Sequence, residues 1–214
     1  MGVMGSPIGL LGGSFDPIHH GHLQLARDAL KHLPLQEVRF IPAAQPWQKG
    51  PLAAAEHRAQ MVQSAIADEP RFALDMHEIE RGGVTYTIDT LHALRSQLPD
   101  HALVLIMGSD QFARLDTWRD WQKIIATAHI AVAQRGMAPP PGSTLHARRD
   151  EAASLASKVG GSIVDFEMTP SDASATEVRR LLNEPPSAKK AQRLSAMVPQ
   201  TVLDYIQHHH LYRN

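Results

Sequence analysis

The fold is decided by residues 8–33, which read IGLLGGSFDPIHHGHLQLARDALKHL. The apolar run from Ile8 to Leu11 predicts a short strand, which ends at the pair Gly12-Gly13. Apolar residues then recur at helical spacing from Leu23 to Leu33. The order strand, glycine loop, helix is therefore the expected first unit of the chain.

The rest of the chain repeats this alternation of strands and helices. Further extended segments are expected at 38–41, 72–79, 103–107, 130–133 and 162–166. Helices are expected at 53–67, 87–98, 150–159, 176–182 and 201–208. Continuous apolar strands are typical of parallel sheets that are covered on both faces. The sequence thus predicts an α/β fold with a doubly wound, mainly parallel sheet and helices on both faces.

Length, composition and charge limit the classes of protein to which this chain can belong. The 214 residues are 43% hydrophobic, which predicts one domain over 1–214, with a helical C-terminal part from about residue 174. Lysine and arginine number 21 against 22 acidic residues, so no nucleic-acid partner is expected. Without cysteine there is no disulfide, and a reducing cytoplasm is the expected compartment. No apolar run approaches the roughly 20 residues of a membrane span, so no membrane partner is expected. The sequence leaves open whether the chain forms a homo-oligomer.

The loop Gly12 to His22 combines features that suit a phosphate ligand. Glycines allow backbone amides to approach phosphate closely, and the following helix start carries about half a positive charge. His19 and His22 lie three residues apart, so both rings can face one ligand. They can donate hydrogen bonds to oxygens on which charge builds during nucleotidyl transfer. Gly21 is expected to leave room for that ligand.

Other interpretations of the histidines remain open. They can be ordinary surface residues in a chain with 13 histidines. They can also share a zinc ion, but no carboxylate or cysteine completes a set of ligands, so no metal site is assigned. The Gly-x-Gly-x-x-Gly fingerprint and the Walker lysine motif are both absent, which disfavours a dinucleotide-binding Rossmann enzyme and a P-loop NTPase.

A second block, Ser174 to Arg179, suits the start of another helix. Ser174 is a natural helix cap, and Arg179 offers a planar fork of donors for phosphate oxygens. Taken alone, such a block predicts only a capped helix.

Together the two blocks resemble the HxGH nucleotidyltransferase superfamily. Gly13 to Pro17, followed by His19, Gly21 and His22, is similar to its signature, and Ser174 to Arg179 resembles its C-terminal phosphate-binding motif. The resemblance implies that His19, His22 and Arg179 are catalytic. It implies ATP contacts from Gly12, Gly13, Ser14, Phe15, His19, His22, Ser174, Thr176 and Arg179.

Three mid-chain features resemble the bacterial nicotinate-mononucleotide adenylyltransferases within that superfamily. They imply that Thr85, Tyr86 and Thr87 receive the nicotinate carboxylate and that Trp118 stacks on the pyridine ring. Gly108 and Asp110 match a block near the adenosine ribose, and Arg135 occupies the place of an adenine-side basic residue. Each has a structural alternative: Tyr86 can fill a sheet edge, Asp110 can cap a helix, and Trp118 can be a packing residue. The segment Ala43 to Lys49 departs from the family pattern and stays unassigned.

The resemblance implies a definite activity. AMP would pass from ATP to nicotinate mononucleotide, giving deamido-NAD and pyrophosphate, with Mg²⁺ held mainly by the ATP phosphates and no covalent intermediate. One alternative keeps the fold with another phosphate acceptor, as in pantetheine-phosphate adenylyltransferases or small cytidylyltransferases. A second is a nucleotide-binding regulator without turnover. A third is a metal-binding protein that uses His208, His209 and His210 as well as the N-terminal histidine cluster.

Overall fold

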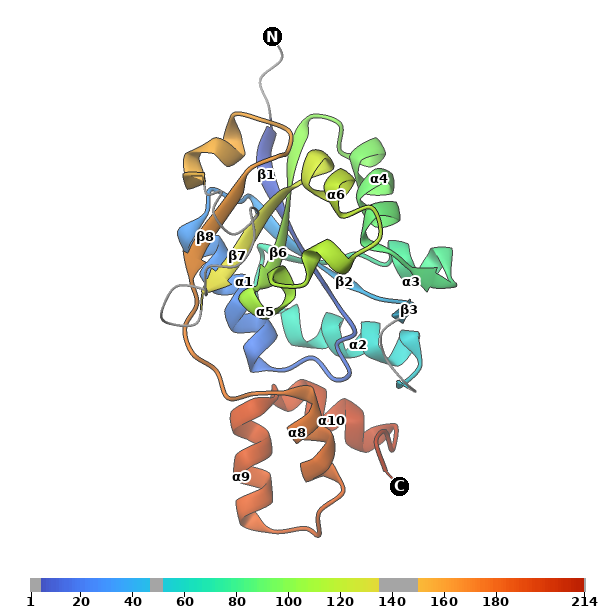
Figure 1. Ribbon diagram of the computed structural model, residues 1–214. Helices are drawn as coiled ribbons and strands as arrows, with labels where there is room; N and C mark the ends of the chain where they lie inside the picture. The colour runs from blue at the N-terminus through green and yellow to red at the C-terminus, as the bar shows by residue number, and fades with distance from the viewer. Residues whose placement is uncertain (1–4, 47–51, 135–149, 214) are drawn as a thin grey trace.

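The computed structural model describes residues 5–46, 52–134 and 150–213, and its centre is a six-stranded parallel sheet (Figure 1). The sheet order is β4-β2-β1-β6-β7-β8, and every neighbouring pair is parallel. The strands are β1 (Gly5–Gly13), β2 (Glu37–Pro42), β4 (Phe72–Leu74), β6 (His101–Gly108), β7 (His129–Gln134) and β8 (Ile163–Glu167). Strand order reverses between β1 and β6, the position at which open α/β sheets form a ligand crevice.

Helices cover both faces of this sheet, which confirms the doubly wound prediction. The α-helices of the described residues are α1 (His20–His32), α2 (Ala55–Ile66), α3 (His77–Arg81), α4 (Thr87–Gln97), α5 (Ser109–Phe112), α6 (Trp121–Thr127), α8 (Ala175–Leu182), α9 (Ala188–Met197) and α10 (Gln200–His208). Two 3₁₀ helices are η1 (Leu115–Thr117) and η2 (Ala152–Ala156). No helix among the described residues has the length and apolar character needed to cross a bilayer.

Side chains of β6 divide between two hydrophobic clusters, one on each face of the sheet. Val104 and Ile106 pack with residues of α1, α2 and α10, whereas Leu103 and Leu105 pack with residues of α4 and α6. This alternation follows from the two-residue period of a strand. Burial on both faces explains why β6 is apolar along nearly its whole length.

Two predicted elements were wrong in part. Segment 72–79 is extended only to Leu74, because the Asp75 carboxylate accepts a hydrogen bond from the His77 amide at 3.0 Å and begins a turn into α3. Segment 150–159 forms only η2. Asp150 is paired there with Ile163: the Asp150 amide donates to the Ile163 carbonyl at 2.7 Å, and the Ile163 amide donates to the Asp150 carboxylate at 3.1 Å.

Some elements were not predicted. They include α9 and a two-stranded parallel sheet of β3 (Gln45–Pro46) and β5 (Val84–Thr85), whose strands have only two residues each. The proline-rich segment 136–143 and residues 47–49 of the departing loop lie outside the described residues.

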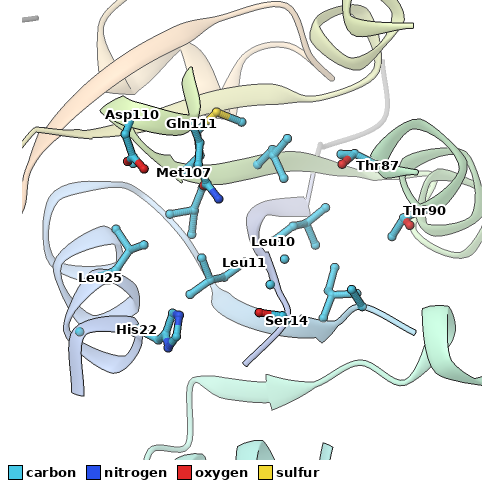
Figure 2. Close-up of a pocket in the computed structure, with 18 of the residues that line it drawn as sticks. Leu10, Leu11, Ser14, His22, Leu25, Thr87, Thr90, Met107, Asp110 and Gln111 are labelled. Carbon is cyan, nitrogen blue, oxygen red and sulfur yellow. The ribbon is translucent and has the colours of Figure 1, made fainter. Parts of the chain in front are cut away.

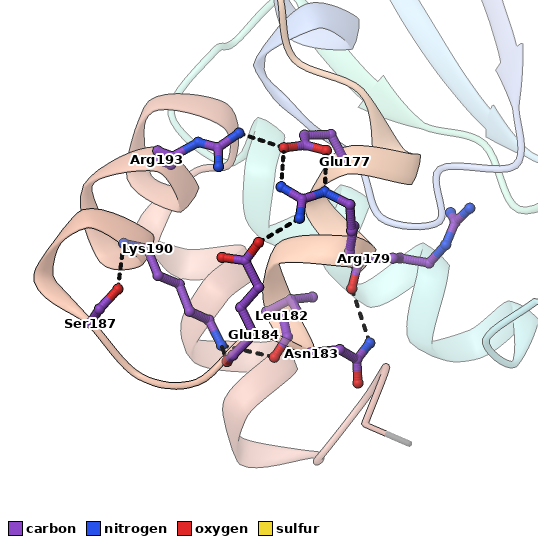
Figure 3. Close-up of polar contacts among 9 residues, drawn as sticks. Glu177, Arg179, Leu182, Asn183, Glu184, Ser187, Lys190 and Arg193 are labelled. Atoms are coloured by element: carbon purple, nitrogen blue, oxygen red, sulfur yellow. Dashed lines mark hydrogen bonds and ion pairs between the residues drawn. The ribbon is translucent and has the colours of Figure 1, made fainter.

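The last three helices lie together at one end of the molecule, and α10 packs on α2 (Figure 1). Polar contacts join α8 to α9 (Figure 3). Glu177 accepts hydrogen bonds from Arg180 at 2.7 Å and from Arg193 of α9, and these partners, Arg180 first, hold the pKa of Glu177 at about 2. The Lys190 ammonium donates to the Leu182 carbonyl at 2.9 Å, near the end of α8. The contacts of Arg193 and Lys190 link α9 to α8.

Candidate active site

A cavity of about 570 Å³ opens at the carboxyl ends of β1 and β6, where the strand order reverses (Figure 2). Its size is in the range of small-molecule sites. Most of the predicted site residues line it: Gly12, Gly13, Ser14, His19, His22, Thr85, Tyr86, Thr87, Gly108, Asp110, Trp118 and Ser174. Phe15, Thr176 and Arg179 are described residues but do not line it. Arg135 lies outside the described residues.

The N-termini of three helices meet at this cavity. His19 is the N-cap of α1, Tyr86 the N-cap of α4 and Ser174 the N-cap of α8, and all three line the wall. The Ser174 hydroxyl accepts a hydrogen bond from the Glu177 amide at 3.2 Å, which confirms the predicted cap. Helix N-termini carry partial positive charge and unpaired amides, so these three helix starts favour anions although the chain has a net charge of −1.

The segment before α8 is held beside α1 by a buried carboxylate. Asp28 of α1 is 4% exposed and accepts a hydrogen bond from the Thr169 amide at 2.8 Å. This contact explains how residues 171–175 reach a wall that the N-terminal loop also forms.

His19 and His22 are stacked, with ring centroids 3.7 Å apart and an angle of 28° between planes. The His19 amide donates to Nδ1 of His22 at 3.3 Å, so a neutral His22 ring carries its proton on Nε2. Phe15 packs its edge against His22 at 5.0 Å from a buried position with φ of 47°. The Phe15 ring therefore supports His22 and is not part of the cavity wall.

The structure supplies a local reason for Gly21. A Cβ atom there would lie 3.1 Å from the His19 ring and 3.2 Å from the Ser171 hydroxyl. Gly21 thus allows two side chains of the wall to lie close to the backbone of α1. A Cβ at Gly12 would meet no described atom within 4 Å, so the bare backbone of that residue is open towards the cavity.

The wall residues that the sequence analysis missed include Glu78 and Arg119. Glu78 is buried and accepts a hydrogen bond from the Thr90 hydroxyl at 2.6 Å, while burial raises its pKa. Arg119 lies over the Tyr86 ring, 4.7 Å from its centroid. Glu78 was hidden because it falls in the segment that was expected to be extended. Arg119 directly follows Trp118, and this position next to a predicted site residue could have indicated that Arg119 also lines the cavity.

Arg179 faces the N-terminal loop. Its guanidinium donates to the Asp16 carbonyl and lies 3.5 Å from the Asp16 carboxylate, which is buried. The sequence analysis predicted phosphate contacts for Arg179 and assigned no role to Asp16.

Comparisons with known proteins agree with this architecture. A family model described as cytidylyltransferase-like matches residues 10–181. A probable nicotinate-nucleotide adenylyltransferase of Dechloromonas aromatica is 44% identical, covering 99% of this chain and 100% of the relative. A protein of the same description from Bordetella avium is 44% identical, covering 96% and 98%.

A solved structure has the same fold. The nicotinic acid mononucleotide adenylyltransferase of Plasmodium falciparum, complexed with NaAD, superimposes with a TM-score of 0.74 over 97% of this chain and 98% of that chain. The two sequences are 19% identical, so this likeness concerns the fold.

Proposed function

Because the chain belongs to the cytidylyltransferase-like family and, within it, to the nicotinate-nucleotide adenylyltransferases, we propose that it transfers AMP from ATP to nicotinate mononucleotide. The products are deamido-NAD and pyrophosphate, and the reaction belongs to NAD biosynthesis. We place it in the cytoplasm, where ATP is available.

The observation that carries this proposal is the meeting of three helix N-termini at one cavity. Both substrates are polyanions, and each helix start supplies amides and positive potential without any charged side chain. The starts of α1 and α8 line the same cavity as Gly12, whose backbone is open, and we assign ATP phosphates to them. The start of α4 is assigned to the nicotinate carboxylate.

The chemistry follows from this arrangement. A phosphate oxygen of the mononucleotide attacks the α-phosphorus of ATP in line; the new P–O bond forms as the bond to the β-phosphate bridge breaks, and pyrophosphate leaves. The attacking phosphate is already ionised, so no protein base is needed. His19 and His22 donate to oxygens that gain charge in the transition state, and the chain contributes positioning and electrostatic stabilisation.

Mg²⁺ enters this proposal as part of the ATP substrate. The described residues hold no cluster of three or more histidine, cysteine, aspartate or glutamate side chains that could bind a metal ion. We therefore assign the cation mainly to the phosphate oxygens of ATP, where it offsets their charge.

The acceptor lies, in this proposal, between Trp118 and the start of α4. Trp118 is partly buried and lines the cavity, and we assign it to stack on the pyridine ring. Thr85, Tyr86 and Thr87 line the same cavity, with Arg119 stacked on Tyr86. Asp110 lies in α5, just after β6, and is assigned to the adenosine ribose of ATP.

One assay tests reaction class and acceptor together. The protein is incubated with ATP, Mg²⁺ and one of nicotinate mononucleotide, nicotinamide mononucleotide or phosphopantetheine, and released pyrophosphate is measured. We expect the highest kcat/KM with nicotinate mononucleotide. Turnover only with phosphopantetheine, or no turnover with any acceptor, would refute the proposed function.

A further inference from the structure

The loop that follows β1 is held from behind by side chains of three distant segments. The Ser14 carbonyl accepts a hydrogen bond from Arg58 of α2 at 2.7 Å, and the Asp16 carbonyl accepts one from Arg179 of α8. The Asp16 carboxylate accepts one from the hydroxyl of Tyr212, at 2.7 Å. Tyr212 belongs to the turn that follows α10, 196 residues away along the chain.

We propose that Tyr212 is a positioning residue for the phosphate-facing loop, acting through Asp16 on Ser14 and the histidine pair. The inference rests on the proposed function, since the loop is assigned there to ATP. Tyr212 touches the back of the loop, whereas Gly13, Ser14 and His19 form its cavity side.

The surroundings of Asp16 explain why the Tyr212 hydroxyl affects the position of this residue. Asp16 is 3% exposed, and its Oδ1 accepts hydrogen bonds from the Tyr212 hydroxyl and from the Ala53 amide at 3.1 Å. Arg179 lies 3.5 Å from Oδ2. A buried carboxylate that loses a donor must find another, so removal of the hydroxyl will shift Asp16 towards its remaining partners.

Tyr212 is suited to be a constant donor. Burial, followed by the hydrogen bond to Asp16, raises the pKa of Tyr212 far above its ordinary value, so the hydroxyl stays protonated at any working pH. Its backbone has φ of 60°, the left-handed region that tyrosine rarely adopts. Such a conformation persists only when its surroundings hold it in place.

The backbone of Tyr212 has anchors that do not depend on its hydroxyl. The Asn183 amide group donates to the Tyr212 carbonyl at 3.0 Å and to the Arg179 carbonyl at 3.0 Å, the second of which is drawn in Figure 3. The Leu211 amide also donates to the Ile206 carbonyl at 3.0 Å. Tyr212→Phe should therefore keep the turn while removing only the contact with Asp16.

Tyr205→Phe is a matched control. Tyr205 lies on α10, and its hydroxyl makes a hydrogen bond of 2.9 Å with Nδ1 of His57 on α2. Both variants remove one hydroxyl from the same end of the molecule, but only one of these hydroxyls contacts the loop.

The test compares kcat, KM for each substrate, melting temperature and hydrogen exchange of residues 12–18. For Tyr212→Phe we expect kcat to fall about tenfold, because small displacements of positioned groups slow a reaction strongly. The KM for nicotinate mononucleotide should change less than twofold, and exchange in 12–18 should become faster. Tyr205→Phe should keep wild-type kcat and wild-type exchange in that segment.

Wild-type kcat and wild-type loop exchange in Tyr212→Phe would overturn the inference. The inference would also be overturned if kcat fell while both variants lost melting temperature equally. The only role of Tyr212 would then be to anchor the C-terminal turn. If the unmodified protein fails to convert nicotinate mononucleotide, the proposed function fails. The exchange comparison still tests the positioning role in that case.

Discussion

His20 and His22 are two residues apart in α1 and have different surroundings. His22 lines the cavity, whereas His20 is partly buried, with a hydrogen bond to the Ser195 backbone, and in the described structure is not part of that wall. We expect His22→Ala to lower kcat by about 10²-fold or more, the scale for loss of one preorganised donor to transition-state charge. ATP binding, measured by calorimetry, should change less.

His20→Ala is the control for this comparison, and it should retain most of the wild-type kcat. Near wild-type kcat in a folded His22→Ala variant would remove His22 from the mechanism.

Trp118 and Trp121 allow a similar comparison. Both are partly buried and pack on the same hydrophobic cluster, but of the two only Trp118 lines the described cavity. Stacking on a base is worth about 1 to 3 kcal/mol. Trp118→Ala should therefore raise the KM for nicotinate mononucleotide by about tenfold, with a smaller effect on the KM for ATP.

Trp121→Ala should lower the melting temperature without this selective change in KM. Equal weakening of both substrates in Trp118→Ala, together with a lower melting temperature, would show that Trp118 serves packing.

Glu78 gives the folded state a pH dependence. Burial raises its pKa, so the folded chain holds this proton more tightly than the unfolded chain does. Its contribution to stability is complete below the ordinary pKa of 4.5 and is lost as pH rises through the raised value. Glu78→Gln has no such group to ionise. As pH rises from 4 to 8, the melting temperature of this variant should therefore rise by a few degrees relative to that of the wild type. A difference that stays constant with pH would contradict this account.

At the scale of elements, we propose that the start of α4 determines the choice of acceptor. Its amides and hydroxyls are donors, which suit a carboxylate, whereas the NH₂ group of an amide would leave buried donors unpaired at about 1 to 3 kcal/mol each. We expect kcat/KM for nicotinate mononucleotide to exceed that for nicotinamide mononucleotide by about tenfold or more. Equal values, measured by pyrophosphate release, would contradict this role of α4.

The elements also show what the sequence could predict. Strands β1, β6 and β7 were predictable because each is a continuous apolar run that buries both faces. The turn at Asp75 was not, because it also depends on a hydrogen bond from the Asp75 amide to the Phe40 carbonyl in a neighbouring strand, at 2.9 Å. Such a partner cannot be read from local periodicity, and Glu78 was missed for that reason.

At the scale of the whole molecule, Arg58 joins remote parts of the chain. It is 1% exposed, and its guanidinium donates to the carbonyls of Ala53, Ser14 and Ala44 at 2.9, 2.7 and 3.0 Å. Arg58→Met would remove the guanidinium donor from these three part-buried carbonyls. We expect the free energy of unfolding, measured with urea, to fall by about 3 kcal/mol.

The exposed Arg27 of α1 provides the control, since Arg27→Met should change this free energy by less than about 0.5 kcal/mol. A similar small effect in Arg58→Met would show that water or other groups replace the guanidinium.

The meeting of distant wall segments was predictable in part. Parallel strands bring their carboxyl ends to one edge, which places the loops after β1 and β6 together. The contacts of Arg179 and Tyr212 with Asp16 were not predictable, because they depend on how α8 and α10 pack. The motif resemblance assigned Arg179 a role from its type and position, and it carried no information about a carboxylate buried beside it.

The reversal of strand order between β1 and β6 also means that ATP binding and acceptor choice depend on different residues. Under the proposed function, the walls assigned to the ATP phosphates come from residues 12–22 and 171–175, and the walls assigned to the nicotinate ring and its carboxylate come from residues 85–87 and 118. Substitutions in these acceptor residues can alter the accepted molecule while the walls assigned to the ATP phosphates keep their shape. A protein with this division can change its acceptor through successive single substitutions, and each intermediate variant can still bind ATP.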